Sequence, residues 1–205
     1  MKRDHIVDAA FEEFGKFDYD GASINAIIEQ SNTSKGTFYH YFPSKKDLYM
    51  TLVRQVADEK MAYMQKLAVT SREKTPGTLF DMLRDQIEAS IRFSAEYPHY
   101  ARFSARIANE TRKDIRKKID AMVGGKTHEL FNRLVREHLE RRNLRDDLSA
   151  DFITRIFIFM ISRFNEFLQE MGVEIEVENM DRIMQVLNEY IDFLENGLAG
   201  KSLHS

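Results

Sequence analysis

The sequence has no cysteine, and only three prolines and nine glycines among its 205 residues. Without cysteine, the chain has no disulfides, no thiolate metal site and no cysteine nucleophile, which excludes the small secreted proteins that disulfides hold together. The shortage of proline and glycine disfavours an all-β fold, because such folds use these residues in many tight turns. These absences favour long helices and suit a reducing compartment.

Long hydrophobic runs are absent as well. The longest, Ile156 to Ile161, is too short to span a bilayer, and no apolar stretch follows the charged start of the chain. We therefore expect a cytoplasmic protein with no membrane partner. The formal net charge is -3, so any nucleic-acid surface must be a local basic patch.

The motifs of common enzymes and metal sites are missing too. There is no G-x-S-x-G, glycine-rich phosphate loop or dinucleotide fingerprint, so the sequence offers no catalytic residue. The histidines lack metal-binding spacing, and the acidic segment Asp18 to Gly21 lacks the further ligands of a calcium loop. We expect no metal and no cofactor. Adjacent carboxylates such as Glu12 and Glu13 are expected to be solvated.

Apolar residues recur at spacings of three and four, which predicts an all-α fold of about nine helices. Three short N-terminal helices come first, and Ser23 and Ser34 are the expected N-caps of the second and third. Asn32 occupies the turn between them, and Ser44 with Asp47 forms a capping box that starts a long fourth helix. The remaining expectations are a linker at 71–77, helices at 78–97, 99–109, 111–141, 149–171 and 178–198, and a break at Gly124-Gly125.

A short helix, a three-residue turn and a second short helix form a helix-turn-helix, whose second helix enters the major groove of DNA. Phe38 and Phe42 lie four residues apart and point inward, so the opposite side of this helix is polar and aromatic. Lysines there can neutralise phosphates, hydroxyls can donate to phosphate oxygens, a glycine allows close approach, and a histidine can donate to a base. The expected DNA-binding residues are Ser23, Ser34, Lys35, Gly36, Thr37, Tyr39, His40, Tyr41 and Lys45.

The run Gly36 to Phe42, followed by Lys45 and Leu48, resembles the recognition-helix signature of the TetR-type (TetR/AcrR) transcriptional regulators. Ser23, Ile24 and Ile27 match the start of the preceding helix in that family. The resemblance covers about the first quarter of the chain. It implies a three-helix DNA-binding domain at 1–54 and a larger effector-binding and dimerisation domain at 55–205.

The sequence departs from the family pattern at three places. Asp18 stands where the family usually has glycine, Ile28 stands where alanine is common, and Ser31-Asn32-Thr33 stands where Ala-Gly-Val is typical of the turn. Asp and Asn are the side chains that best replace glycine in a left-handed conformation. We expect these departures to be tolerated, because they do not touch the outward face of the recognition helix.

The resemblance also implies an inducer pocket in the larger domain, and that part of the chain is rich in methionine and phenylalanine. Methionine packs adaptably around apolar ligands, and a few polar groups among apolar side chains can orient a small molecule. The candidate ligand-binding residues are Met61, Met64, Phe103, Arg106, Ile107, His128, Phe131, Leu134, Phe157, Arg163 and Phe164.

The last two predicted helices are apolar on more than one face, which a single domain cannot easily bury. A second copy of the chain could cover the surplus, so we expect a homodimer. The candidate interface residues are Ile156, Met160, Phe167, Ile183, Leu187, Ile191 and Leu194.

Three functions remain open at this point. The first is a homodimeric regulator, most simply a repressor, that binds a double-stranded DNA operator and is released by a small-molecule effector. The second is a DNA-binding protein controlled by a protein partner, with the C-terminal part only a dimerisation bundle. The third is a helical enzyme, for which the sequence names no catalytic residue.

Overall fold

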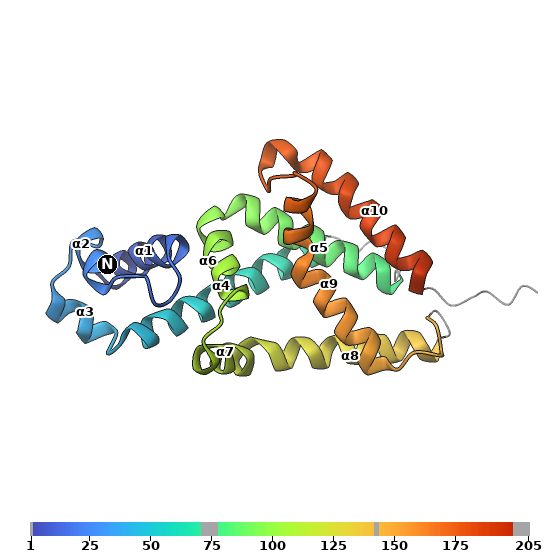
Figure 1. The fold of residues 1–205 in the computed structure, drawn as a ribbon, viewed down its shortest axis with the longest axis horizontal. Coiled ribbons are helices and arrows are strands. Elements are labelled where there is room, and N and C mark those ends of the chain that lie inside the picture. The colour runs from blue at the N-terminus through green and yellow to red at the C-terminus, as the bar shows by residue number, and fades with distance from the viewer. Residues whose placement is uncertain (1, 71–77, 142–143, 199–205) are drawn as a thin grey trace, which may run out of the picture. The chain divides into compact units, whose positions relative to one another are not determined.

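The computed structural model describes residues 2–70, 78–141 and 144–198, so the expected linker at 71–77 lies outside it. All regular elements in these ranges are helical (Figure 1). They are α1 (Lys2–Lys16), α2 (Ile24–Gln30), α3 (Lys35–Tyr41), α4 (Lys45–Thr70), α5 (Leu79–Glu96), α6 (Pro98–Ala108), α7 (Lys113–Ile119), a π-helical turn (Asp120–Gly124), α8 (Gly125–Glu140), α9 (Ala150–Glu170), a 3-10 turn (Val177–Asn179) and α10 (Met180–Leu198).

The all-α prediction is confirmed, with ten α-helices in the described ranges where about nine were expected. The difference arises at the predicted Gly124-Gly125 break. There α7 ends at Ile119, a π-helical turn covers Asp120–Gly124, and α8 starts at Gly125. Two adjacent glycines are poor helix formers and allow such an interruption.

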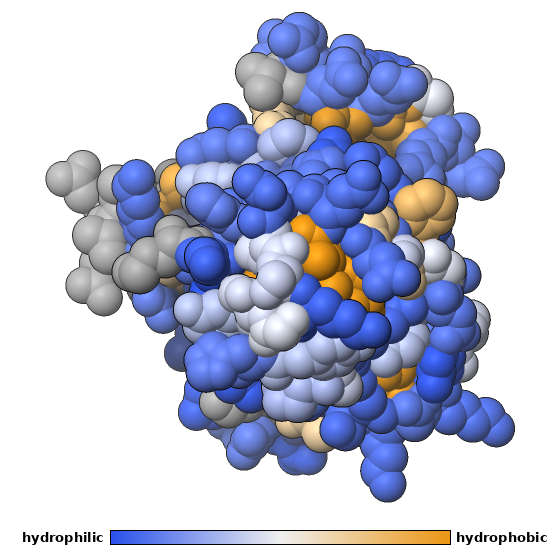
Figure 2. Space-filling model, turned by 90° about the vertical axis from the view of Figure 1, so that its left-hand side faces the viewer, coloured by the Kyte–Doolittle hydropathy of each residue, from blue (hydrophilic) through white to orange (hydrophobic). Residues whose placement is uncertain are grey.

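The chain divides into two compact units, which we call unit 1 (Met1–Ala62 and Glu96–Val123) and unit 2 (Tyr63–Ala95 and Gly124–Ser205). Unit 1 therefore contains α6 and α7 as well as the predicted helix-turn-helix. The functional division at residue 54 stays a prediction. Figure 2 faces the end of the molecule that carries α1, α2 and α3, where the surface is largely hydrophilic with small apolar patches.

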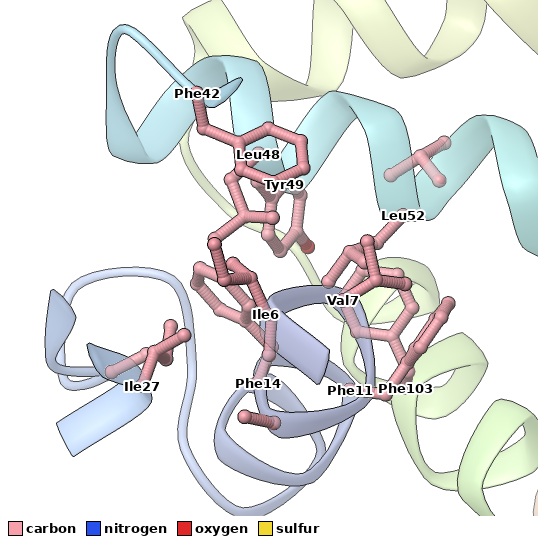
Figure 3. Packing of buried hydrophobic residues seen from close by; sticks show 14 of the residues in the cluster. Ile6, Val7, Phe11, Phe14, Ile27, Phe42, Leu48, Tyr49, Leu52 and Phe103 are labelled. Carbon is pink, nitrogen blue, oxygen red and sulfur yellow. The ribbon is translucent and has the colours of Figure 1, made fainter. Parts of the chain in front are cut away.

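An aromatic cluster forms the core of unit 1. Phe11 and Phe14 from α1, Tyr49 from α4 and Phe103 from α6 are all buried (Figure 3). Their ring centroids lie 5.0 Å apart for Phe14 and Tyr49, 5.2 Å for Tyr49 and Phe103, and 5.5 Å for Phe11 and Phe103. These edge-to-face contacts are the arrangement that aromatic rings prefer. Burial raises the pKa of Tyr49, which therefore stays neutral.

Helix α6 packs against α1 beside Gly15. A Cβ at this position would lie 3.4 Å from the Cβ of Arg102, which is about van der Waals contact. Beside it, Arg102 Nη2 donates to Glu12 Oε1 at 3.0 Å, and Arg106 Nη2 donates to the carbonyl of Lys16 at 2.8 Å. A cation at the C-terminal end of a helix is favourable because that end carries partial negative charge. Arg106 therefore caps the C-terminal end of α1.

Unit 2 has a separate core, formed by α5, α8, α9 and α10. Phe157 and Phe164 on α9 are fully buried, and Phe157 contacts Phe80 on α5 with ring centroids 5.9 Å apart. From α10, the side chains at spacings of three and four enter this core. They are Ile183, Leu187, Ile191 and Leu194.

Candidate nucleic-acid interface

Serine caps fix the starts of the two helices of the helix-turn-helix. Ser23 Oγ accepts from the amide of Ala26 at 3.4 Å, and Ser34 Oγ accepts from the amide of Thr37 at 3.1 Å. Both serines have extended backbone and were predicted as N-caps, which the structure confirms. The capping box that starts α4 is also confirmed, with the amide of Asp47 donating to Ser44 Oγ at 3.1 Å.

The turn between α2 and α3 is held by local hydrogen bonds. Asn32 has a φ of 49°, and within the described ranges it is the one non-glycine residue with a positive φ. Ser31 Oγ donates to the carbonyl of Ile28 at 3.1 Å, and the hydroxyls of Ser31 and Thr33 lie 2.8 Å apart. Asparagine is one of the few residues that adopts this conformation easily. Asn32 therefore replaces the family's turn glycine as predicted.

Two carboxylates support the loop before α2. Asp18 Oδ1 accepts from the amide of Gly21 at 2.7 Å, so Asp18 shapes the loop by a hydrogen bond and not by a left-handed backbone. Glu13 is only 4% exposed, and its Oε1 accepts from the amide of Ser23 at 2.7 Å. The expectation that Glu13 is solvated is wrong. Its spacing of seven from Ile6, which places it on the buried face of α1, was the signal for this position.

The inner side of α3 packs into unit 1. Phe38 is fully buried and Phe42 is 3% exposed, as their spacing of four predicts. Ile27 from α2 is buried beside them in the same cluster, and Phe42, Leu48 and Ile27 are drawn in Figure 3. This packing fixes which side of α3 faces away from the protein.

The outer side of α3 is polar and aromatic. Lys35, Gly36 and His40 are exposed, Tyr39 is 42% exposed and Tyr41 is 40% exposed. Thr37 is half-buried, and its hydroxyl lies 2.9 Å from Ser34 Oγ. The structure brings these residues onto one short helix. This surface offers hydroxyl donors, an imidazole and an ammonium group to a ligand, which is the chemistry that phosphate and base edges require.

Lys45 is the exception among the predicted DNA-binding residues. Its Nζ donates to the carbonyls of Asp20 at 3.2 Å and Ala22 at 2.6 Å, and lies 5.0 Å from the centre of the Tyr19 ring. Burial lowers the pKa of Lys45, and the neighbouring carboxylates oppose that shift. In the described structure Lys45 therefore ties α4 to the α1–α2 loop, and its ammonium is directed at the protein.

Comparison with known proteins supports the helix-turn-helix assignment. Residues 6–51 match the family model for bacterial regulatory proteins of the tetR family. Residues 77–199, more than half of the chain, match the model for a tetracyclin repressor-like C-terminal domain. The chain belongs to the TetR family. The predicted resemblance is thus confirmed, and the second match extends it from the first quarter of the chain to the C-terminal part.

Individual TetR-family proteins are similar to this chain at moderate identity. The regulator RutR of Escherichia coli K12 is 28% identical over 101 residues, covering 49% of this chain and 45% of RutR. The repressor Rv1474c of Mycobacterium tuberculosis is 34% identical over 82 residues, covering 40% of this chain and 41% of that protein. This chain therefore matches less than half the length of these curated relatives, which are named as regulators and not as enzymes.

A solved TetR-family regulator from Chloroflexus aurantiacus J-10-FL has the same fold over nearly the whole chain. It has a TM-score of 0.73 and 25% sequence identity, and the match covers 98% of this chain and 94% of that one. The chain therefore has the fold of a TetR-family protein.

The candidate ligand-binding residues belong to both units. Phe103, Arg106 and Ile107 belong to unit 1, where Phe103 is buried in the aromatic core and Arg106 caps α1. Phe157 and Phe164 are buried in the core of unit 2, with Phe131 and Leu134 half-buried against it. A pocket lined by all of these residues stays a prediction. The sequence pattern showed that these residues are buried, but not in which core.

The remaining ligand candidates lie at the surface. Met61 is 58% exposed, and Met64 is half-buried. Arg163 pairs with Glu166 on the same helix at 2.5 Å. His128 lies 3.6 Å from Asp151, in a polar hollow of about 880 Å³ that also contains Arg136. None of these positions is tested as a ligand contact, so a role in binding stays a prediction.

The predicted dimer stripe is buried within the chain. Ile183, Leu187, Ile191 and Leu194 are 0–5% exposed and lie in the core of their own unit, so the expectation that these four residues form the interface is corrected. The second apolar stripe of α10 consists of Val186, Tyr190 and Phe193. Val186 is buried and Tyr190 half-buried, whereas Phe193 is 72% exposed. Of the α9 candidates, Phe167 is 38% exposed, while Ile156 and Met160 are half-buried.

An open apolar groove runs between α9 and α10 on this second side. Its volume is about 720 Å³. Tyr190 lines the groove, and its hydroxyl donates to the carbonyl of Met160 at 3.3 Å. The side chains that line it are Phe159, Met160, Arg163, Glu166, Phe167, Glu170, Met171, Val186, Glu189, Tyr190 and Phe193.

Two further features are absent from residues 2–70, 78–141 and 144–198. Within these ranges, no helix is both long enough and apolar enough to cross a bilayer. The same ranges contain no group of three or more histidine, aspartate or glutamate side chains placed to hold a metal ion.

Proposed function

We propose that this TetR-family chain is a cytoplasmic homodimeric repressor that binds a palindromic DNA operator through α3 and is released by a small apolar or amphipathic molecule. The observation that carries the proposal is the two-sided character of α3. Phe38 and Phe42 anchor one side in the core, while Tyr39, His40 and Tyr41 are exposed on the other. Exposed hydroxyl and imidazole groups on one side of a short helix suit contacts with phosphates and base edges.

The proposed DNA contacts divide into two kinds. Lys35, Thr37 and Tyr41 bind phosphate oxygens and set the register of the protein, whereas His40 and Tyr39 reach base edges. Gly36 leaves room for the backbone of α3 to approach the groove. Ser23 and Ser34 present the N-terminal ends of their helices, where free amides favour phosphate. Lys45 orients α4 and contributes no direct phosphate contact.

Dimerisation presents two copies of α3 to successive half-sites. We assign the interface to the groove between α9 and α10, because Phe159, Phe167 and Phe193 expose apolar area there that a soluble monomer rarely tolerates. Arg163, Glu166 and Glu189 border the groove and carry both signs of charge. A two-fold interface places the same patch on both copies, so these charges can pair across it.

The proposed role as a repressor rests on the Rv1474c relative, which is named as a transcriptional repressor. The effector enters unit 2 next to Phe131 and Leu134, which are half-buried at the edge of the core. A ligand that binds one conformation of unit 2 better than another shifts the population toward it. Coupling between two sites of this kind typically amounts to about 1–3 kcal/mol, or about 5- to 150-fold in operator affinity.

A second function has one observation in its favour. Phe157 and Phe164 are fully packed in unit 2, and a filled core suits a bundle that serves only to dimerise. In that case a protein partner, and not a small molecule, controls DNA binding.

The test begins with the genomic fragments that the protein retains, followed by fluorescence anisotropy on the duplex they share. Hydrophobic acids, amphipathic cations and aromatic compounds are added in turn, with thermal melting measured on the same panel. A compound that raises the melting temperature and weakens operator binding supports the repressor. In the Leu134→Phe variant the same compound should lose its effect while operator binding persists. If the panel changes neither quantity, the partner-controlled regulator replaces this proposal.

A further inference from the structure

The helix-turn-helix is connected to the rest of unit 1 at two ends. Its first end is the loop between α1 and α2, which contains Tyr19, Asp20 and Ala22. Its second end is the first turn of α4, which contains Lys45 and Lys46. Between these ends, α2 and α3 are short helices of seven residues each. Their orientation therefore depends on how firmly the two ends are held.

Lys45 connects the two ends to each other. From the first turn of α4, its Nζ reaches the carbonyls of Asp20 and Ala22 on the opposite loop. The Tyr19 ring lies beside this ammonium at 5.0 Å. Tyr19 is in turn packed on the unit 1 core through Tyr49, with ring centroids 5.1 Å apart. The Lys45 side chain therefore bridges the two ends of the helix-turn-helix.

A third segment, Arg112 to Asp114 at the start of α7, holds both ends from outside. Arg112 Nη1 pairs with Asp20 Oδ1 at 2.5 Å, and its guanidinium lies 4.9 Å from the centre of the Tyr19 ring. Asp114 Oδ2 pairs with Lys46 Nζ at 2.5 Å. Arg112 and Asp114 also contact each other at 3.4 Å. Two residues of this segment, Arg112 and Asp114, therefore bind the entry and the exit of the helix-turn-helix.

The segment itself is firmly placed within unit 1. Ile115 and Ile119 from α7 are buried in the unit 1 core. Arg116 Nη1 donates to the carbonyls of Ile107 and Ala108 at the end of α6, at 3.2 and 3.3 Å. Directly after α7, the chain passes through the π-helical turn Asp120–Gly124 into unit 2. π-Helical turns inside helices are rare and frequently lie at functional sites.

We propose that Arg112 and Asp114 are positioning residues for α3, which hold both ends of the helix-turn-helix in the orientation that reads DNA. This inference rests on the proposed DNA-binding function. In this proposal, neither Arg112 nor Asp114 contacts DNA. A displacement of α7, whatever its origin, then reaches α3 through Asp20 and Lys46 at once. Exposed ion pairs add little to global stability, so the effect of these two is on local order and not on folding.

The first experiment measures hydrogen exchange in the free protein and needs no DNA. The variant carries Arg112→Gln and Asp114→Asn together, and the matched control is Arg155→Gln, which removes an exposed pair with Asp151 on α9. We expect amides of α2 and α3 to exchange about tenfold faster in the double variant, because local opening governs exchange. Amides of α9 and the melting temperature should not change. Equal exchange in α2 and α3 of the variant and the wild type would overturn the proposal.

The second experiment measures specificity on two duplexes, one recovered by the wild type from a randomised pool and one with the same bases shuffled. We expect the double variant to lose about tenfold in the ratio of the two affinities, since misplacing α3 removes base contacts more than phosphate contacts. An equal loss on both duplexes would make Arg112 a phosphate ligand and overturn the proposal. An unchanged ratio would do the same.

A conservative substitution provides the rescue control. Arg112→Lys keeps a positive charge between Asp20 and Asp114, and should retain the exchange rates and specificity that Arg112→Gln loses. Equal losses in Arg112→Lys and Arg112→Gln would show that the charge at this position does not position α3. If the wild type recovers no specific duplex at all, the proposed function fails, while the exchange measurement still decides whether Arg112 and Asp114 order the helix-turn-helix.

Discussion

Unit 1 and unit 2 differ in how they use apolar side chains at the surface. In unit 1 the large aromatic residues meet in a closed cluster, and the exposed ones on α3 are tyrosines with a hydroxyl. In unit 2 three phenylalanines without any polar atom, Phe152, Phe159 and Phe193, are more than half exposed. An exposed tyrosine suits a hydrated ligand such as DNA, whereas an exposed phenylalanine is typical of a surface that another protein covers.

The largest expected effect separates the two apolar stripes of α10. Leu187→Glu should unfold unit 2, because it buries an unpaired charge and costs more than about 4 kcal/mol. Phe193→Glu should stay helical but sediment as a monomer, since this side chain is exposed in one chain and covered in two. Circular dichroism and sedimentation velocity at one concentration measure both outcomes.

The matched control for this pair is Phe17→Glu, which changes a 49% exposed phenylalanine of unit 1. It should sediment like the wild type. A folded Phe193→Glu protein that remains a dimer would show that the groove between α9 and α10 is not the interface.

The next effect compares how salt acts on the two surfaces. DNA binding by unit 1 should lose about 10³- to 10⁵-fold in affinity between about 50 and 200 mM salt, if about 6 to 10 phosphates are neutralised. Dimerisation through unit 2 should change far less, because apolar contacts release no counterions. Anisotropy and sedimentation over the same salt series give both slopes. A flat DNA response would contradict the phosphate contacts.

A smaller effect separates the two sides of α3. Phe38→Ala should lower the free energy of unfolding by about 3–5 kcal/mol, because it leaves a cavity in the unit 1 core. Tyr39→Ala should change that free energy by no more than about 0.5 kcal/mol, as surface substitutions do, while weakening operator binding. Chemical denaturation and anisotropy on both variants provide the comparison. Similar destabilisation by the two substitutions would mean that α3 is not oriented as described.

The smallest effect uses two equivalent N-caps. Ser34 caps α3 in unit 1, and Ser149 caps α9 in unit 2, where its Oγ accepts from the amide of Phe152 at 3.2 Å. Ser34→Ala and Ser149→Ala should each cost about 1 kcal/mol of stability. Only Ser34→Ala should weaken DNA binding beyond this loss. Equal operator affinity of the two variants would place α3 outside the interface.

Local signals in the sequence were sufficient to predict most of the local structure of unit 1. The caps at Ser23, Ser34 and Ser44, the positive φ of Asn32 and the inward side chains of α3 all follow from residues within four positions of one another. Glu13 and Lys45 were misjudged because their partners lie 10 and 23 residues away or more. The periodicity of α1 places Glu13 on the buried face, but it does not reveal that Glu13 and Lys45 bind backbone atoms of the loop before α2.

Unit 2 could be predicted only as a set of helices. Two apolar stripes on α10 indicate two buried faces, but not which one packs inside the chain. Tertiary packing decides between them. Leu187 is buried in the core, whereas Phe193 lies at the surface. In the same way, the spacing of Phe103 and Phe157 indicates burial, whereas the fold decides that they belong to different cores.

The central claim is that the outward face of α3 reads a palindromic operator, and selection from a pool of random duplexes tests it most directly. The wild type should enrich a palindrome with two equal half-sites. His40→Ala should enrich a palindrome that differs at one position in each half-site, whereas Thr37→Ala should enrich the wild-type sequence with lower affinity. Enrichment of no common sequence by the wild type, or an identical preference in the His40→Ala protein, would contradict this account of α3.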